Sequence, residues 1–352
     1  MASPQRVRAR ASGRVNLIGD HTDYMGGLAM PMTINHSTVV EGVRGGDSLS
    51  LVSDSARGRV EVGLPVKDPG AAEPEWARYP AAVAAELHAA GALPGGFAGA
   101  VTSDVPRGAG LSSSAALEIA VALALGSPLP ESEKEATELA KLCQRAEHAA
   151  VGLPSGLMDQ LSICTGRSGH ATLIDFDSLE VEQVAMQTDA HIWVIHSGQA
   201  RRLDSSAYAE RRRSAEAAEE LLGPLPRADL SAIGALADPL LARRARHVRS
   251  ECDRVRQFAE FMAQGDLGSA GSVMAASHAS LRRDYEVSTP ALDQLVDALA
   301  SIGSVYGARL TGAGFGGCVV ALTSEEFQLS ALGDDHLGWE VHPVDGIDLQ
   351  LG

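Results

Sequence analysis

A turn rich in glycine and serine runs through VPRGAGLSSSAALEIA, at residues 105–120, directly before a run of good helix formers. Gly108 and Gly110 permit positive φ, so several backbone amides can point at one anion beside the positive end of the next helix. The serines at 112–114 are suitable N-terminal caps for a helix predicted over 113–125. The stretch predicts a phosphate cradle, with a glycine-rich cap of a buried helix as the alternative.

No lysine lies in this loop, because the lysines of the chain are Lys67, Lys134 and Lys141. A Walker A nucleotide site, which needs the lysine of GxxxxGK[ST], is therefore excluded. The charge of a bound triphosphate would have to be balanced by backbone amides, by a serine-bound Mg²⁺ and by Arg107.

Two carboxylates farther along the chain extend this chemistry. Glu147 follows Cys143 by four residues in a helix predicted over 132–151, so it lies on or beside the apolar stripe, where an unpaired carboxylate is costly. Mg²⁺ shared with a serine of the loop would offset that cost, and an ion pair with an arginine is the alternative. Asp159 follows a turn of Gly, Pro, Ser and Gly among apolar residues. We expect it to be a buried acid in a turn, and a buried acid at such a place to have a functional role.

The elements that must position these groups follow from hydrophobic periodicity. Strands are predicted at 7–18, 36–43, 48–53, 59–63 and 97–103, and again, after the helices at 113–125 and 132–151, at 170–176 and 191–197. Helices are predicted at 205–223, 228–264, 267–282 and 290–302, before a strand, loop, strand unit, YGARLTGAGFGGCVVALT. This order predicts two α/β lobes with a boundary near 176–190.

The composition narrows the class of protein. The 352 residues carry a net charge of −16, which argues against nucleic acid and anionic membranes as partners. Arginine clusters at 211–213 and at 243, 244 and 246 are predicted to be mostly solvated helix faces. The four cysteines are widely spaced, with no CxxC pair, which indicates a reduced, cytoplasmic protein. No apolar run is long enough to span a bilayer.

Three segments together resemble the motifs of the GHMP small-molecule kinases, and within them the galactokinase family. They are GRVNLIGDHTDYMGG at 13–27, the serine loop, and LTGAGFGGCVVAL at 310–322. Shorter matches at EWARYPAAV, AEHAAVGLPSGLMDQ, SSAYAERRR and LRRDYEVSTPALDQL extend the likeness over nearly the whole chain. The resemblance implies an α+β, two-lobed GHMP kinase fold. Its mixed α/β lobe (ribosomal protein S5 domain 2-like) would cover 1–180, and a ferredoxin-like lobe would cover 181–352, with its last segment free to return to the first lobe.

The resemblance also implies roles for particular residues. As catalytic residues, Asp159 and Arg14 would flank the anomeric hydroxyl of a sugar. Further sugar contacts are implied for Asp20, His21, Asp23, Gly156 and Tyr208. The ATP phosphates would contact Gly108, Gly110, Leu111, Ser112, Ser113 and Ser114, with Trp76 near the adenine. Mg²⁺ would be held by Ser114 and Glu147, and the glycine loop at 312–317 would brace the site.

The implied activity is ATP-dependent phosphorylation of the anomeric hydroxyl of galactose or a close analogue, giving the sugar 1-phosphate and ADP. The partner would be the small-molecule sugar, and the protein would be a cytoplasmic monomer or weak dimer. Asp20 stands where the family usually carries Glu, and Met25 where it more often carries a polar residue. GalNAc, a C6-altered hexose and a pentose are therefore alternative sugars. A non-catalytic sensor of sugar and ATP, and a GHMP kinase acting on mevalonate or homoserine, are further alternatives, although HTDY and EWARY favour a sugar.

Overall fold

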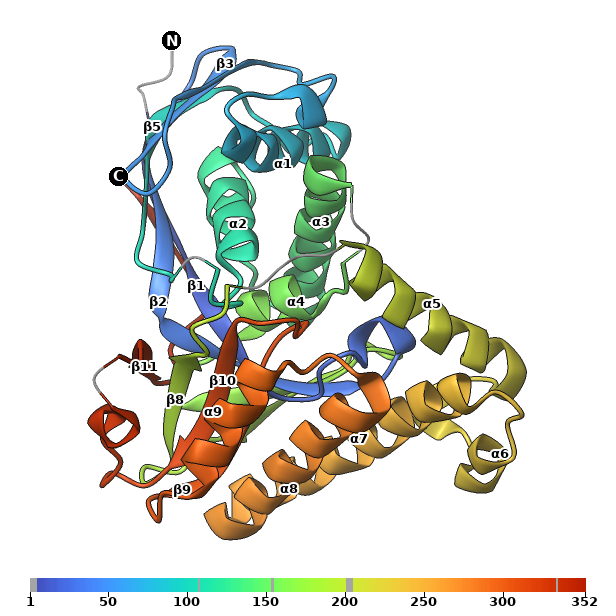
Figure 1. The fold of residues 1–352 in the computed structure, drawn as a ribbon. Coiled ribbons are helices and arrows are strands. Elements are labelled where there is room, and N and C mark those ends of the chain that lie inside the picture. Colours follow the sequence, from blue (N-terminus) through green and yellow to red (C-terminus); the bar gives the residue numbers. More distant parts are fainter. Residues whose placement is uncertain (1–4, 107, 153–154, 201–204, 334) are drawn as a thin grey trace.

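The computed structural model describes residues 5–106, 108–152, 155–200, 205–333 and 335–352. The chain folds into two lobes, each with its own sheet (Figure 1). The first lobe, whose helices α1 to α4 occupy the upper part of the figure, contains an eight-stranded mixed sheet. The second lobe, in the lower part, contains a four-stranded antiparallel sheet and the helices α5 to α9. The predicted two-lobed α+β architecture is confirmed.

The sheet of the first lobe is built on two long strands, β1 (Gln5–Ile18) and β2 (Leu28–Arg44). Val7, Ala9 and Ala11 of β1 are buried between more exposed arginines, the alternation expected of a strand with one covered face. The main order of the sheet is β12-β1-β2-β5-β3-β4, and β6 and β7 extend it from the other end of β2. The remaining strands are β3 (Ser48–Ser53), β4 (Val60–Gly63), β5 (Phe97–Ser103), β6 (His170–Asp175), β7 (Val181–Ala185) and β12 (Ile347–Leu351).

Four helices belong to this lobe, and they carry the phosphate-loop segment. They are α1 (Arg78–Ala89), α2 (Ser113–Leu125), α3 (Glu133–Val151) and α4 (Met158–Thr165). The helix α2 packs on β1 and β2 and also contacts α1, α3 and α4. It is buried almost all round, and its many alanines allow this close approach on every side. The N-terminus of α2 is thus fixed rigidly beside the lobe boundary.

The ends of α3 are determined by local sequence. Ser132 Oγ accepts a hydrogen bond from the Glu135 amide, and the Glu135 side chain accepts one from the Glu131 amide, an arrangement close to a capping box. The helix ends at Gly152, which adopts the left-handed conformation with φ of 71°. These caps place Glu147 in the last turns of α3, next to the lobe boundary.

The second lobe contains the antiparallel sheet β11-β8-β10-β9. Its strands are β8 (His191–His196), β9 (Val305–Leu310), β10 (Cys318–Thr323) and β11 (Gly338–Val341), and its helices are α5 (Ser205–Leu222), α6 (Leu230–Gly234), α7 (Pro239–Gln264), α8 (Leu267–Ser280) and α9 (Pro290–Ala300). The backbones of α8 and β9 nearly touch: a Cβ on Gly271 would lie 2.1 Å from the Tyr306 carbonyl oxygen, and one on Gly307 would lie 2.1 Å from the Gly271 carbonyl oxygen. Only glycine fits at both positions, and this contact fixes the strand that leads into the glycine loop.

The two lobes share a hydrophobic core. Val15, Leu17 and Ile34 of the first lobe lie in one buried cluster with Val194 and Val320 of the second. The last strand, β12, pairs antiparallel with β1, so the C-terminal segment lies in the first lobe. Since β7 still pairs with β6, the chain leaves the first sheet after Ala185, slightly beyond the predicted 180/181 boundary.

Several predicted elements differ from the structure. The strand predicted at 36–43 is the second part of β2, whose first part contains Pro31 and faces an irregular stretch of β1 between Asn16 and Ile18. The helix predicted over 228–264 is wrong as one element, because Asp238 caps a new helix with Pro239 at its first position. The elements α1, α4, β7, β11 and β12 were not predicted.

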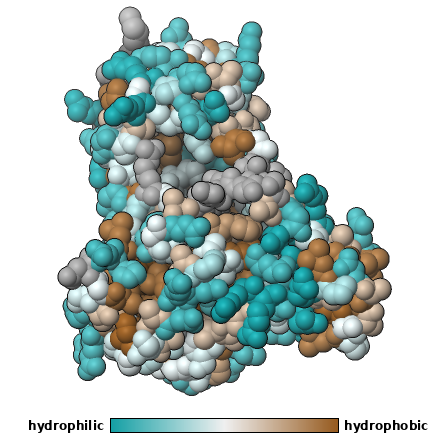
Figure 2. All heavy atoms as spheres, viewed as in Figure 1, coloured by the Kyte–Doolittle hydropathy of each residue, from teal (hydrophilic) through white to brown (hydrophobic). Residues whose placement is uncertain are grey.

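The surface corrects one expectation about the charged residues. Hydrophilic residues cover much of the face in Figure 2, and hydrophobic ones gather at the corner made by α5 and α6, where Leu221 and Leu230 are exposed. The prediction of solvated arginine clusters is wrong for Arg244, which is 1% exposed and pairs with Glu286. Among the described helices, none combines the length and apolar character needed to cross a membrane.

Candidate active site

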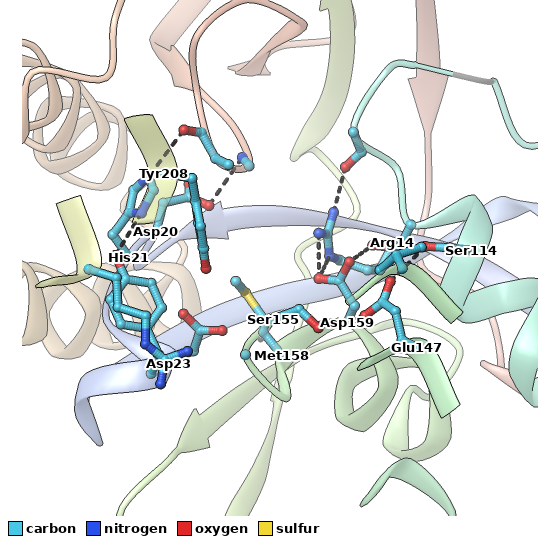
Figure 3. A pocket seen from close by; sticks show the side chains of 18 of the residues that line it. Arg14, Asp20, His21, Asp23, Ser114, Glu147, Ser155, Met158, Asp159 and Tyr208 are labelled. Atoms are coloured by element: carbon cyan, nitrogen blue, oxygen red, sulfur yellow. Dashed lines mark hydrogen bonds and ion pairs between the residues drawn. The ribbon is translucent and has the colours of Figure 1, made fainter. Parts of the chain in front are cut away.

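A cavity of about 740 Å³ lies where the lobes meet, and most of the residues singled out in the sequence line it. Its wall is formed by the end of β1, the serine loop, the last turns of α3, the start of α4, α5 and the glycine loop. Figure 3 shows Asp20, His21, Asp23 and Tyr208 in one region and Arg14, Ser114, Glu147 and Asp159 in another, with Ser155 and Met158 between them. The cavity therefore has two chemically different ends.

Arg14 and Asp159 form an ion pair at the second end. Arg14 Nε and Nη2 lie 3.0 and 2.5 Å from Asp159 Oδ1, and Arg14 Nη1 donates to the Gly110 carbonyl oxygen at 2.6 Å. The expectation of a buried acid in a turn is corrected, because Asp159 lies in the first turn of α4 and its side chain is 29% exposed. The carboxylate is thus both accessible and fixed in orientation.

The serine loop adopts the conformation that its glycines allow. Gly108 and Gly110 have φ of 73° and 75°, and Ser112, the N-cap of α2, has φ of 58°. Ser112 does not cap the helix with its side chain; its hydroxyl donates to Asp159 Oδ2 at 2.5 Å. The loop lines the cavity together with Leu111, Ser113 and Ser114. Arg107 lies outside the described residues.

The first amides of α2 have no partner within the helix and stand at its positive end. Because Ser112, Ser113 and Ser114 all line the cavity, this helix end faces the enclosed space. An anion placed there would meet several hydrogen-bond donors and a favourable dipole. The cradle therefore stays a prediction, whereas the side-chain cap predicted for Ser112 is not formed.

Glu147 reaches the same region from α3. Ser114 Oγ donates to Glu147 Oε1 at 3.1 Å, and Ser155 Oγ and Gln160 Nε2 donate to Oε2 at 2.7 and 3.1 Å. Within the described part of the chain, no arginine forms an ion pair with Glu147, so the arginine alternative receives no support. A carboxylate and a hydroxyl side by side suit Mg²⁺, which prefers hard oxygen ligands and shares them with phosphate and water.

A second acid, Glu118 of α2, is fully buried behind Glu147. Gln160 Nε2 donates to Oε2 of both glutamates at 3.1 Å. Burial, together with the neighbouring charge of Glu147, raises the pKa of Glu118 well above its usual range. Burial thus favours the uncharged form of Glu118, whereas Glu147 lines the cavity.

The first end of the cavity contains a cluster of rings around His21. His21 Nε2 donates to the Ala313 carbonyl oxygen at 3.2 Å, since a carbonyl can only accept, and Nδ1 pairs with the Tyr24 hydroxyl at 2.9 Å. The Tyr24 hydroxyl also pairs with that of Tyr285 at 2.8 Å, and the ring of Tyr208 lies 5.8 Å from that of His21. Groups from both lobes therefore fix the imidazole.

Asp23 begins the short 3-10 helix Asp23–Met25 and lies against Gly156. A Cβ on Gly156 would lie 1.6 Å from Asp23 Oδ2, so a side chain there would displace the carboxylate. Burial, and next the negative charge of Asp159, raise the pKa of Asp23 to about 6. Burial also raises the pKa values of Tyr24 and Tyr208 well above their usual range, so both phenols keep their proton.

Asp20 borders the cavity but turns toward the second lobe. Its side chain is 2% exposed and forms an ion pair with Arg309. Its other oxygen, Oδ1, accepts a hydrogen bond from the Gly312 amide at 3.1 Å. Burial raises the pKa of Asp20, and the Arg309 charge opposes that shift.

Of the residues that the resemblance names one by one, Trp76 does not line the cavity, and the glycine loop contributes Gly312 and Ala313 to the lining. The Trp76 indole nitrogen donates to the Arg57 carbonyl oxygen at 3.1 Å, whereas Tyr79, on the helix that follows, does line the cavity. Ser155, Gln160 and Arg212 were not predicted as site residues. Ser155 lies in the quoted stretch AEHAAVGLPSGLMDQ, so its proximity to Asp159 was a usable signal, whereas nothing in the sequence paired Gln160 with two glutamates.

Family comparisons give a consistent result. The chain matches the model of the GHMP kinases N terminal domain over residues 78–167 and that of the GHMP kinases C terminal over residues 258–334. It matches the galactokinase galactose-binding signature over residues 2–43. The N terminal match falls in the first lobe and the C terminal match in the second. The galactose-binding signature contains the segment from Arg14 to Asp23.

Individual proteins are similar over most of the chain. A galactokinase of Canis lupus familiaris is 43% identical over 341 residues, which are 93% of this chain and 86% of the relative. A galactokinase of Homo sapiens is 42% identical over 336 residues, 91% of this chain and 84% of the relative.

Solved structures agree with these relatives. The structure of Lactococcus lactis galactokinase complexed with galactose has a TM-score of 0.89 and 30% identity, and the match covers 97% of this chain and 95% of that one. A mevalonate kinase from Methanococcus jannaschii has a TM-score of 0.71 at 19% identity, covering 96% and 98%, a likeness of fold alone. The GHMP kinase fold implied by the sequence is confirmed.

Proposed function

This chain belongs to the galactokinase family of the GHMP kinases, and on that premise we propose how its residues transfer the γ-phosphoryl group of ATP to the anomeric hydroxyl of galactose. The products are galactose 1-phosphate and ADP. The observation that carries the proposal is the ion pair of Arg14 and Asp159, at the open N-terminus of α2 in one cavity. The proposed proton acceptor thus lies beside the proposed phosphate cradle.

The nucleotide phosphates are assigned to the serine loop. Gly108 and Gly110 give the loop its positive φ angles, and Ser112, Ser113 and Ser114 line the cavity where α2 begins. Backbone amides and the helix dipole replace the lysine of a Walker A loop.

Mg²⁺ is assigned to Ser114 and Glu147. Their oxygens lie 3.1 Å apart, and Ser155 and Gln160 orient the carboxylate from its other side. When bound, the ion would neutralise negative charge on the phosphates. The absence of a cluster of three or more His, Cys, Asp or Glu side chains among the described residues is compatible with an ion that shares phosphate and water ligands.

Asp159 is assigned as the acceptor of the proton from the sugar. The anomeric O–H bond breaks, its proton passes to the Asp159 carboxylate, the oxygen bonds to the γ-phosphorus, and the bond from that phosphorus to ADP breaks. Arg14 keeps the carboxylate in place and contributes a positive charge beside the transferring group. Phosphoryl transfer depends mainly on alignment and charge balance, which is what this pair supplies.

The sugar hydroxyls are assigned to the other end of the cavity. Asp23 accepts hydrogen bonds from hydroxyls, Tyr208 and His21 form the adjacent wall, and Gly156 leaves the room that Asp23 occupies. Trp76 does not line the cavity, so we propose no adenine contact for it.

We also propose a reducing compartment, the cytoplasm, for the protein, since Cys143, Cys164, Cys252 and Cys318 are all buried free thiols. A monomer or weak dimer stays our proposal for its oligomeric state.

The test is ADP release by purified protein with ATP and Mg²⁺ over a panel of galactose, GalNAc, 6-deoxygalactose, arabinose and mevalonate. We expect sugar-dependent ADP release with the highest kcat/KM for galactose. Sugar binding without ADP release would favour a sensor. A higher kcat/KM for another panel member would reassign the substrate.

A further inference from the structure

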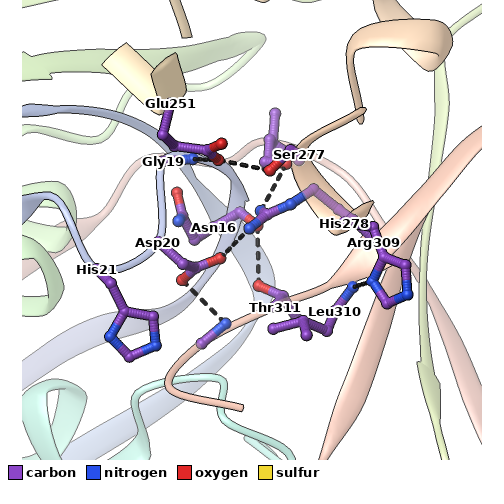
Figure 4. A network of polar contacts seen from close by, with 12 residues as sticks. Asn16, Gly19, Asp20, His21, Glu251, Ser277, His278, Arg309, Leu310 and Thr311 are labelled. Carbon is purple, nitrogen blue, oxygen red and sulfur yellow. Dashed lines mark hydrogen bonds and ion pairs between the residues drawn. The ribbon is translucent and has the colours of Figure 1, made fainter. Parts of the chain in front are cut away.

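A buried ion pair joins the turn at residues 19–23, to which we assign sugar contacts, to the second lobe. Arg309, at the end of β9, is 0% exposed and pairs through Nη2 with Asp20 Oδ2 (Figure 4). The neighbouring Gly312 amide donates to Asp20 Oδ1 at 3.1 Å. Both carboxylate oxygens therefore bind groups on the segment that begins the glycine loop.

Further hydrogen bonds join the same two segments. Arg309 Nη1 donates to the Leu17 carbonyl oxygen at 3.0 Å, and the Thr311 hydroxyl donates to the Asn16 carbonyl oxygen at 2.8 Å. Several hydrogen bonds thus join the end of β1 to the end of β9, although Asn16 and Arg309 are 293 positions apart in the sequence.

The helix α7 holds the backbone of the turn from the other side. Glu251 Oε1 accepts from the Gly19 amide at 3.2 Å, and its Oε2 pairs with Arg254 Nε at 2.7 Å. His247 Nε2 contacts the Asp20 carbonyl oxygen at 3.1 Å. Asp20 is thereby fixed at its backbone by α7 and at its side chain by Arg309.

We propose that Arg309 is a positioning residue for sugar binding: through Asp20 and Gly312 it keeps the turn that carries His21 and Asp23 aligned with the glycine loop. In this role the Asp20 carboxylate is the counter-ion of Arg309 and does not read the hydroxymethyl end of the sugar. The inference rests on the proposed function, and it concerns which residues discriminate among sugars.

Burial and hydrogen bonding support the role of Asp20 as the counter-ion of Arg309 and not as a sugar contact. A carboxylate that is 2% exposed presents almost no surface to a ligand in the cavity. An arginine side chain is charged in proteins, so one as deeply buried as Arg309 requires a partner of opposite charge beside it. His21 completes the connection, because its Nε2 donates to Ala313, the residue after Gly312. A shift of the Arg309 segment would therefore move two cavity residues together.

The experiment compares galactose with 6-deoxygalactose, which lacks only the hydroxyl at C6. In Asp20→Asn we expect kcat/KM to fall about 10-fold or more for both sugars, with their ratio within twofold of the unsubstituted protein. If kcat/KM falls for galactose alone, the ratio of the two kcat/KM values moves about 10-fold toward unity. That result would overturn the proposal by showing that Asp20 contacts the C6 hydroxyl.

Arg309 itself is tested with Arg309→Met, which alters no cavity-lining side chain. We expect a rise in the KM for both sugars of about 10-fold, with a smaller change in the KM for ATP. Unchanged sugar KM values with a lowered Tm would show a merely structural role and contradict positioning. If Arg309→Met does not fold, the double variant Asp20→Asn, Arg309→Gln keeps a hydrogen-bonded pair without stranding a charge. That variant is expected to exceed Asp20→Asn in sugar kcat/KM, and a further loss would contradict the proposal.

Calorimetric titration with each sugar, without nucleotide, separates this inference from the proposed function. If the unsubstituted protein binds galactose but turns over none, the proposed function fails while the binding ratio still tests Arg309. Equal losses of affinity for the two sugars in Asp20→Asn are expected there too, and a selective loss for galactose would again contradict the inference.

Discussion

Arg14 donates two hydrogen bonds to a single oxygen of Asp159, from Nε at 3.0 Å and from Nη2 at 2.5 Å, and its third nitrogen donates to the Gly110 carbonyl oxygen at 2.6 Å. One planar guanidinium thus sets the position of the carboxylate relative to the serine loop. In a reaction governed by alignment, this geometry matters as much as the charge.

Replacing Arg14 by lysine keeps the positive charge and removes the planar guanidinium, whose fork of nitrogens donates to Asp159 and Gly110. Loss of one hydrogen bond to a charged group is worth about 1.5–3 kcal/mol, so we expect kcat for Arg14→Lys to fall about 10- to 100-fold. The matched control is Arg8→Lys, because Arg8 lies on the same strand with a side chain 41% exposed. Steady-state kinetics would check both variants, and an unchanged kcat in Arg14→Lys would show that the fork is dispensable.

The proposed ligands of Mg²⁺ give a second prediction. Ser114→Ala and Glu147→Gln should each raise the Mg²⁺ concentration needed for half-maximal activity, by about 10-fold if one direct ligand is lost. Binding of Mn²⁺ with ADP, followed by electron paramagnetic resonance, gives a readout that does not depend on turnover. Glu138→Gln, on the exposed side of the same helix with a side chain 64% exposed, is the control. Equal Mn²⁺ affinity in all three variants would remove the assignment.

The contact of Gly156 with Asp23 gives a third prediction. Since an added Cβ would lie 1.6 Å from Asp23 Oδ2, Gly156→Ala must turn the carboxylate away. We expect the KM for galactose to rise about 10-fold or more, with little change in the KM for ATP. Gly234→Ala is the control, because a Cβ there meets nothing within 4 Å. A normal sugar KM in Gly156→Ala would show that Asp23 does not bind the sugar from this position.

The raised pKa of Asp23, about 6, gives a fourth prediction, with opposite signs for binding and stability. The ionised form accepts hydrogen bonds from the sugar, so galactose affinity should fall as the pH drops below about 6. Stability has the opposite trend: the folded protein holds this proton more tightly than the unfolded chain does. That contribution is complete below the usual pKa of 3.8 and is lost as pH rises through about 6. Asp23→Asn should remove both pH dependences, as titration calorimetry and Tm measurements from pH 4.5 to 8 would reveal. A step in galactose affinity near pH 6 that persists in Asp23→Asn would assign it to another group.

Local sequence was sufficient for the serine loop and its helix. The predicted helix over 113–125 has the same bounds as α2, because glycines and serines before it and Gly126 after it mark both ends. The break in the helix predicted over 228–264 was also legible, since Asp238 and Pro239 are a cap and a first-turn residue. The apolar periodicity continues across Asp238 and Pro239, so it predicted one helix where these two residues mark the start of a new one.

Contacts between distant segments could not be derived in this way. Asp20 pairs with Arg309, 289 positions away, and Gln160 joins two glutamates from different helices. Residue type predicts that a buried carboxylate needs a partner, but only the fold determines which one. Ser112 illustrates the same limit, because its hydroxyl binds Asp159 where the sequence predicted a cap.

The central claim is that Asp159 accepts the proton of the anomeric hydroxyl while the serine loop holds ATP. The most direct test is ³¹P and ¹³C NMR of a reaction with ATP, Mg²⁺ and galactose, run with the unsubstituted protein and with Asp159→Asn. We predict galactose phosphorylated at C1 alone, formed at least about 100-fold more slowly by Asp159→Asn, with galactose still bound by that variant. Phosphate at another carbon, or product formed at a normal rate by Asp159→Asn, would contradict the account.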